Sequence, residues 1–242
     1  MTQSQFKVLV GFGPYGNTTI NPSLAVVKKL QTMSIVNKGN TSYEIVSRQV
    51  SSEFNKCIQE TCAYIDEFQP DAVIMLGEYP GRSMITVERV AINYNDSTRY
   101  GVKDEAGYAP QGTEVVDNGP AAYFSTLPLR RIVTELRASG IPADISDSAG
   151  TLMCNHLMYG ALHHVNNATK AEDVKKGVVI PVGWIHLPAL PEMAAKEENL
   201  GMPSMTAELA TEAVLVTIQS IAKNLQSGNA DFDIPVKSRL LV

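Results

Sequence analysis

The chain has 242 residues, of which 44% are hydrophobic and 19% are charged, and its formal net charge is −5 at pH 7. This length suits one large domain with a substantial core, and no basic run longer than two residues indicates nucleic acid or an anionic membrane as a partner. No stretch approaches the roughly 18 apolar residues of a membrane span, and the N-terminal sequence lacks a signal-peptide pattern, so we expect a cytoplasmic protein.

Apolar runs alternate with segments of helical period, a pattern typical of strands that are linked by crossover helices. Strands are predicted at residues 6–11, 43–48, 72–77, 85–94, 143–146 and 177–185. Helices are predicted at residues 22–33, 52–68, 123–139, 152–165 and 204–225. We therefore expect one α/β domain over residues 1–227, built as a sandwich around a largely parallel, twisted sheet.

Two segments show neither the apolar run of a strand nor the period of a helix. Residues 99–120 are polar and rich in Gly and Pro, and they are too long for an ordinary connection. We expect them to form either a hairpin or a loop that covers a site. Residues 228–242 are expected to form an irregular C-terminal tail that lies along a surface or a partner subunit.

The first glycine-rich turn, VLVGFGPYGNTT at residues 8–19, has the G-x-G-x-x-G spacing of a dinucleotide-binding loop. Such a loop opens directly into a helix, so that free N–H groups meet the pyrophosphate. Here Pro14 removes one donor, and the next helix signal is delayed until Pro22. The turn instead presents Phe12 and Tyr15 at the end of a strand, where ligands bind in open α/β sheets, although both rings also suit a role in capping the core.

The segment SDSAGTLMCNHLMYGALHH, residues 146–164, places Cys154 in the first turn of a predicted helix. A helix N-terminus lowers the pKa of a thiol, which makes Cys154 a candidate nucleophile, and a small buried apolar cysteine is the structural alternative. His156 lies two residues away and points to another face of the helix, so it cannot act as the base. His163 and His164 lie further along the helix, where we expect surface or packing roles.

The remaining histidine, His186, is the candidate base by elimination. It follows the apolar run GVVIPVGWIH and is expected at the carboxyl end of a strand, at the same edge of the sheet as Cys154. A third group should orient the imidazole. Glu88 interrupts the apolar strand pattern of GRSMITVERVAIN and is the candidate for that role, although a solvated strand glutamate gives the same pattern.

Together these segments resemble the pyroglutamyl-peptidase family of cysteine exopeptidases. The resemblance extends over nearly the whole chain, through GFGPYG…INPS, GRSMITVERVAIN, NGPAAYFSTLP, SAGTLMCNHLMYG, IHLPALPE and PSM. It implies an α/β/α sandwich and a cytoplasmic homo-oligomer, a dimer or a tetramer, with neither a cofactor nor a metal. The implied activity is removal of an N-terminal pyroglutamyl residue from small peptides.

The resemblance also assigns roles to individual residues. It implies that Cys154 is the nucleophile, His186 the base and Glu88 the orienting acid. The family's arginine near the oxyanion best matches Arg99. The positions implied for the substrate pocket or the oxyanion site are Phe12, Tyr15, Glu78, Leu152 and Met153.

Several positions depart from the family's pattern, and they change the shape and charge of the pocket but not the chemistry. The departures are Tyr15, Glu78, Pro80, Leu152, Ala189 and Met193. A buried Glu78 could accept a hydrogen bond from the lactam N–H, but without a cation it would be costly or become protonated. These departures leave two alternatives, a weakly active homologue and a lactam-binding protein without catalysis. A third alternative, a nucleotide-dependent oxidoreductase, comes from the glycine-rich turn, and Pro14 argues against it.

Overall fold

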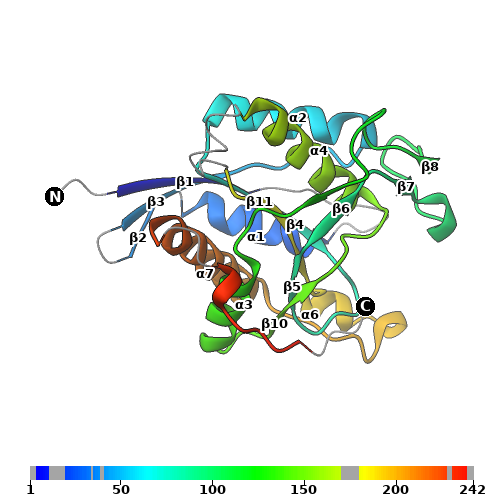
Figure 1. The fold of residues 1–242 in the computed structure, drawn as a ribbon. Helices are drawn as coiled ribbons and strands as arrows, with labels where there is room; N and C mark the ends of the chain where they lie inside the picture. The colour runs from blue at the N-terminus through cyan, green and yellow to red at the C-terminus, as the bar shows by residue number, and fades with distance from the viewer. Residues whose placement is uncertain are drawn as a thin grey trace.

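The computed structural model describes residues 4–10, 20–33, 35–38, 41–169, 180–227 and 231–238. Its centre is a seven-stranded sheet (Figure 1). In sheet order the strands are β10 (Ala143–Ser146), β5 (Ile85–Glu88), β11 (Val182–Leu187), β4 (Ala72–Glu78), β1 (Ser4–Val10), β3 (Thr41–Ser47) and β2 (Ile35–Lys38). The helices are α1 (Pro22–Gln31), α2 (Phe54–Phe68), α3 (Leu129–Ala138), α4 (Met153–Ala168), α6 (Pro191–Ala194) and α7 (Ala207–Gln226).

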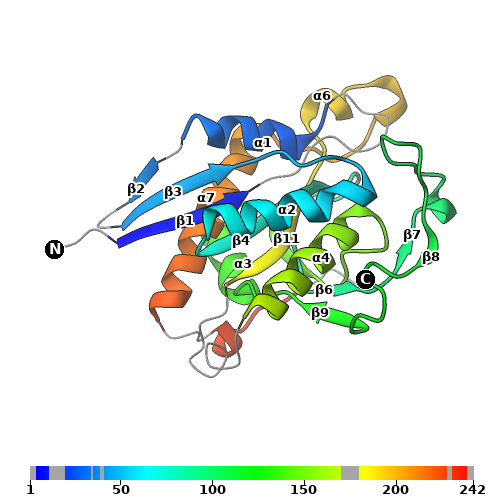
Figure 2. The ribbon, with the colours of Figure 1, turned by 90° about the horizontal axis from the view of Figure 1, so that it is seen from above.

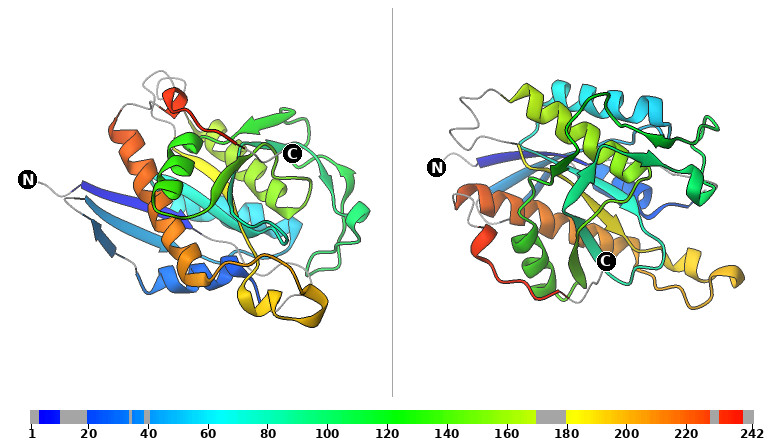
Figure 3. Two further views of the ribbon diagram at one scale, coloured as in Figure 1. Left: turned by 90° about the horizontal axis from the view of Figure 1, so that it is seen from below. Right: turned by 45° about the vertical axis from the view of Figure 1, so that its right-hand side comes forward.

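Helices cover both faces of the sheet. Figure 1 shows α2 and α4 above it and α3 and α7 below it, and Figure 2 shows α2 and α4 side by side on the upper face. The view from below in Figure 3 shows α1, α3 and α7 on the opposite face. Each face has its own apolar cluster, which contains Met153 and Trp184 on the α4 side and Val26 and Ile132 on the other. The predicted single-domain α/β/α sandwich is confirmed, and within the described part of the chain no helix is long and apolar enough to cross a membrane.

Strand direction divides the sheet into two parts. Strands β3, β1, β4 and β11 run parallel to one another, whereas β5 runs antiparallel to β11 and parallel to β10. The edge strand β2 is antiparallel to β3. The sheet is therefore largely parallel, as predicted, but β10 and β11 end at opposite edges. The strand that precedes Cys154 therefore does not end at the same edge as the strand that carries His186.

Local sequence explains several element boundaries. Asn21 caps α1 by accepting a hydrogen bond from the backbone N–H of Ser23 at 2.8 Å, and Pro22 occupies the first helical position. Strand β4 is buried along almost its whole length, as expected for a central strand that is covered on both faces. Gly77 in β4 must lack a side chain, because a Cβ atom there would lie 2.3 Å from the ring of Trp184.

Some predicted elements have different boundaries in the structure. The predicted strand at 85–94 is divided into β5 and β6 (Val90–Ile92), and β6 pairs with β9 (Ala122–Phe124) in a separate two-stranded sheet. The break falls at Arg89, whose N–H donates to the carbonyl of Ser146 and whose carbonyl accepts from Ser125. The predicted helix at 123–139 is shorter, because β9 takes its first residues and α3 begins only after Pro128.

The structure also describes residues 99–120 and residues 231–238 of the tail, the segments without a clear period. In residues 99–120, β8 (Gln111–Thr113) pairs antiparallel with β7 (Asn95–Asp96), which supports the hairpin alternative. Short 3-10 turns are η1 (Thr98–Tyr100), η2 (Glu197–Asn199) and η3 (Asp231–Asp233). The described part of the tail lies along α3 of its own chain, where Arg137 donates to the carbonyl of Lys237 at 2.7 Å.

Candidate active site

The site is built around His186 and Glu88 on the α4 face of the sheet. The antiparallel register places His186 of β11 opposite Thr86 of β5. Because side chains alternate along a strand, Glu88 points to the same face as Thr86. Nδ1 of His186 lies 2.7 Å from Oε1 of Glu88, and the two side chains are 2% and 0% exposed. The structure therefore brings together a buried acid and an imidazole in the geometry of an orienting pair.

Glu88 has two further hydrogen-bond donors. The guanidinium of Arg82 lies 3.1 Å from the same Oε1 atom, and the hydroxyl of Thr86 lies 3.2 Å from it. Arg82 also donates to Ser146 at 3.3 Å, and its guanidinium lies 3.9 Å from the ring centroid of Tyr79. Sequence reasoning missed Arg82, although a buried carboxylate requires a cation and Arg82 is only six residues away.

Cys154 lies in the first turn of α4, as predicted, and α4 packs against β11 and β6. The helix start has no side-chain cap of its own. Asn155 fixes it to β6 instead, by accepting from the N–H of Ile92 at 2.8 Å and donating to its carbonyl at 2.9 Å. These hydrogen bonds fix the start of α4, and with it Cys154, to the strand that follows β5.

The electrostatic environment of Cys154 differs from the prediction. Burial raises the pKa of the thiol strongly, and the carboxylates of Glu88 and Glu78 raise it further. The backbone N–H of Cys154 lowers the pKa, in the direction expected at a helix start, but burial outweighs it. The resting sulfur is consequently a thiol, and a thiolate must form together with a neighbouring cation.

The other histidines are occupied elsewhere. His156 is buried, with Nε2 2.9 Å from the carbonyl of Phe54 and Nδ1 3.2 Å from Asn95, and burial lowers its pKa to about 4. His163 contacts the hydroxyl of Tyr123 at 2.9 Å. His164 contacts Asp66 at 2.8 Å. These contacts agree with the packing and surface roles predicted for them.

Glu78 ends β4 next to Leu187 of β11. Its Oε1 atom is buried and has no hydrogen-bond partner among the residues that the structure describes. Burial raises the pKa of this carboxyl to about 7. No cation pairs with Glu78 among the described residues, and its charge depends on pH near neutrality.

The remaining predicted site residues include some outside the described part of the chain, one that is exposed and one that is fully buried. Phe12 and Tyr15 lie outside the described residues, as does the whole G-x-G-x-x-G match. Arg99 is exposed in η1, where its guanidinium lies 4.9 Å from the ring centroid of Tyr100. Leu152 is the residue before α4, whereas the side chain of Met153 is fully buried in the core. Met153 can therefore contact a substrate only through its backbone.

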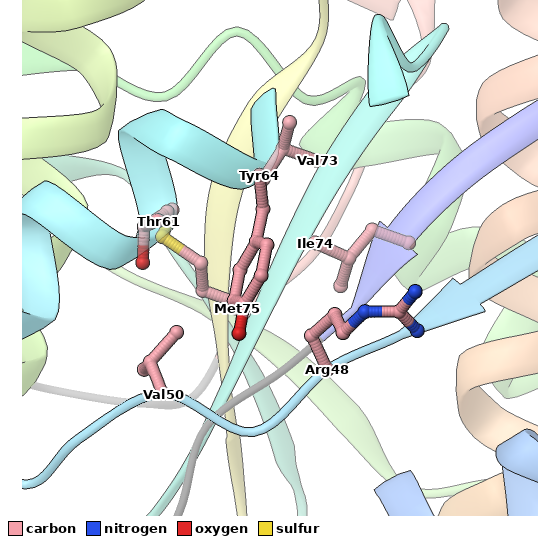
Figure 4. Close-up of a pocket in the computed structure, with 7 residues that line it drawn as sticks. All are labelled: Arg48, Val50, Thr61, Tyr64, Val73, Ile74 and Met75. Carbon is pink, nitrogen blue, oxygen red and sulfur yellow. The ribbon is translucent and has the colours of Figure 1, made fainter. Parts of the chain in front are cut away.

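Two of the cavities in the described part of the chain lie apart from the His186–Glu88 pair. The smaller, shown in Figure 4, has a volume of about 10 Å³, enough for at most one water molecule. It is lined by Arg48, Val50, Thr61, Tyr64, Val73, Ile74 and Met75. The larger, about 200 Å³, lies between α1 and α6. Neither is lined by a predicted site residue, and the described residues contain no cluster of three side chains that could hold a metal ion.

Comparison with known proteins covers almost the whole chain. A family model described as pyroglutamyl peptidase matches residues 6–224. The pyrrolidone-carboxylate peptidase of Mycobacterium tuberculosis is 46% identical over 98% of this chain and 99% of its own. Among solved structures, the pyrrolidone carboxyl peptidase from Thermococcus litoralis superposes with a TM-score of 0.81 at 32% identity, over 96% of this chain and all of that one.

The pyroglutamyl peptidase I of Bacillus amyloliquefaciens gives a TM-score of 0.76 at 35% identity, over 91% of this chain and 97% of that one. Sequence and structure therefore agree over the same residues that carry the His186–Glu88 pair and Cys154. The chain belongs to the pyroglutamyl peptidase family.

Proposed function

We propose that this chain is a cysteine exopeptidase that hydrolyses the bond after an N-terminal pyroglutamyl residue of a peptide. The observation that carries the proposal is the buried hydrogen bond from His186 to Glu88, in a family member that has Cys154 in the first turn of the helix packed over it. Family membership supports the reaction class, and the geometry supports the assignment of roles.

In the first step, Cys154 is the nucleophile and His186 is the base. Because Nδ1 of His186 is bound to Glu88, Nε2 is the nitrogen that accepts the thiol proton. The sulfur attacks the pyroglutamyl carbonyl, and free N–H groups at the start of α4 stabilise the oxyanion. The imidazolium then protonates the amine as the C–N bond breaks, which leaves a thioester on Cys154.

In the second step, water hydrolyses the thioester. His186 takes a proton from the water as its oxygen attacks the thioester carbonyl, and the proton returns to sulfur as the C–S bond breaks. Glu88 keeps the ring in one orientation and stabilises its positive charge in both steps. Since burial disfavours an isolated thiolate at Cys154, the two charges must arise together by transfer of one proton.

The substrate pocket must hold the lactam ring of the pyroglutamyl residue. We assign Phe12 and Tyr15 as its apolar walls, because a lactam ring has no free α-amine and suits such walls. Leu152 and the backbone of Met153 border the nucleophile, and Arg99 is proposed near the oxyanion. Glu78 is proposed to face the lactam as a protonated carboxyl.

The decisive experiment measures hydrolysis of a pyroglutamyl-coumarin amide. Cys154→Ser and Cys154→Ala should lower kcat by about 10⁴-fold or more, because removing a nucleophile abolishes the covalent route. Cys62→Ser, on the partly exposed face of α2, is the matched control and should retain activity. Substantial turnover by both Cys154 variants would remove this residue from the mechanism. An inactive wild-type protein that still binds pyroglutamate would instead support the non-catalytic alternative.

We further propose that the enzyme works in the cytoplasm as a homo-oligomer without a cofactor. The family resemblance supports this assembly, and light scattering across a range of protein concentrations tests it. A mass equal to one chain of 26.2 kDa at all concentrations would contradict it.

A further inference from the structure

Arg82 lies in the turn between β4 and β5 and contacts two strands of the sheet, β5 and β10. Its guanidinium donates to Glu88 and Thr86 of β5 and to Ser146 at the end of β10. Its side chain is only 16% exposed. A planar guanidinium with five N–H donors in a fixed fork can reach acceptors on two strands at once, whereas a lysine has three donors on a single atom.

The charge of Arg82 matters because the carboxyl group of Glu88 is fully buried. A buried carboxylate without a cation is costly, and Arg82 is the permanently charged group among the three that contact its Oε1 atom. Without Arg82, the lowest-energy outcome is uptake of an extra proton by the Glu88–His186 pair. A protonated pair has no basic nitrogen left for the thiol of Cys154.

Tyr79 holds the guanidinium from the solvent side. Its ring centroid lies 3.9 Å from the guanidinium carbon of Arg82 and 5.3 Å from the ring centroid of His186, with the two rings nearly perpendicular. Arg82 is thus fixed between an aromatic face and three oxygen acceptors. Such a fixed group determines the position of the carboxylate as well as its charge.

We propose that Arg82 is a positioning residue of the site, which keeps Glu88 ionised and fixed against Nδ1 of His186 so that the imidazole can accept the thiol proton. This inference rests on the proposed function for its kinetic consequence. Arg82 touches neither Cys154 nor a reacting atom, and it acts through Glu88.

The test compares Arg82→Ala and Arg82→Lys with the wild-type enzyme. Arg82→Ala should lower kcat by about 10²-fold or more while KM changes little, since loss of acid–base catalysis costs at least this much. Arg82→Lys should be intermediate, because lysine restores the charge but not the fork of contacts. Millimolar guanidinium, far below denaturing concentrations, should restore kcat of Arg82→Ala in a saturable way. A purely structural role predicts no such rescue.

The matched control is Arg48→Ala. Arg48 is also half-buried and lies 4.6 Å from the ring centroid of Phe68, but it donates to the carbonyl of Ser47 and not to Glu88. Its removal should leave kcat unchanged and insensitive to guanidinium. An unchanged kcat in Arg82→Ala, or a loss that guanidinium does not restore in a folded variant, would overturn the inference. If Arg82→Ala does not fold, Arg82→Lys with a wild-type kcat would overturn it as well.

A second measurement separates this inference from the proposed function. The rate at which iodoacetamide alkylates Cys154, followed by mass spectrometry of its peptide, reports activation of the thiol without any substrate. It should fall about 10-fold or more in Arg82→Ala and recover with guanidinium, as expected when the base is lost. If no variant hydrolyses the coumarin amide but alkylation follows this pattern, the substrate proposal fails and the role of Arg82 stands. Equal alkylation rates in wild type and Arg82→Ala would contradict that role.

Discussion

Glu78 and Glu88 end the two strands that flank β11, and each has one buried carboxyl oxygen without a hydrogen-bond partner in the described part of the chain, yet their other contacts differ. Glu88 is fully buried and has a guanidinium, a hydroxyl and an imidazole around one oxygen. Glu78 is less buried, but its Oε1 atom has no partner in the described part of the chain, and its pKa is raised to about 7. Burial raises the pKa of Glu78, which has no cation among the described residues, whereas a guanidinium lies 3.1 Å from the carboxyl group of Glu88.

The largest effect that distinguishes the two acids is expected from Glu88→Gln. Glutamine keeps the size of the side chain but removes the charge that stabilises an imidazolium at His186, so kcat should fall by about 10²–10⁴-fold with little change in KM. Steady-state kinetics on the coumarin amide measure kcat and KM separately and so test this expectation. A kcat within a factor of a few of wild type would mean that Glu88 is only a structural partner of Arg82.

Glu78→Gln should affect stability, and its sign depends on pH. The folded pKa of Glu78 is about 7, above the ordinary value of 4.5, so the folded protein binds the extra proton between these values. Stability is therefore lost as pH rises from about 4.5 through about 7, and the penalty persists above it. Glutamine removes the penalty, which is about 1–2 kcal/mol after allowance for solvent screening of a partly exposed group.

Thermal unfolding at two pH values tests this prediction. The melting temperature of Glu78→Gln should exceed that of wild type by about 2–6 °C at pH 9 and match it at pH 4. His156, whose pKa is lowered to about 4, destabilises both proteins equally in acid, so the difference between them isolates Glu78. An increase of the same size at both pH values would show a packing effect instead.

The smallest effect is expected at Tyr79, which follows Glu78 and whose ring contacts Arg82 and His186. Tyr79→Ala removes one cation–π contact and one edge contact with His186, together about 1–2 kcal/mol at a half-exposed position. We expect a loss of kcat/KM of about 10-fold. Tyr79→Phe should retain full activity, because neither ring contact uses the hydroxyl. Equal losses in both variants would point to the hydroxyl and contradict this interpretation.

Sequence patterns predicted the elements that have strong local signals. Residues 143–146 form β10 as predicted, and the Asn21–Pro22 cap marked the start of α1. The pattern could not show that the run at 85–94 is divided between two sheets, because its apolar residues continue through Arg89 while the hydrogen-bond partners change. The short edge strand β2 has too few residues for a periodic signal.

Sequence analysis predicted which residues belong to the site better than it predicted how they are arranged in space. Glu88 and His186 were selected from the sequence, and the structure places them 2.7 Å apart. Arg82 was missed because its partnership with Glu88 arises only when the chain reverses between β4 and β5. The direction of β10 was not predicted, because strand direction is a property of the whole sheet, which no single segment specifies.

The N-terminus of α3 has no cap from its own neighbourhood, and Asp231 supplies one by accepting from the backbone N–H groups of Arg130 and Arg131 at 3.3 and 2.8 Å. The donors and the acceptor lie about 100 residues apart along the chain, so this contact contributes to a high contact order. During synthesis, α3 emerges from the ribosome long before Asp231 is made. Its first turn must therefore stay hydrated or find a temporary partner until Asp231 has been made.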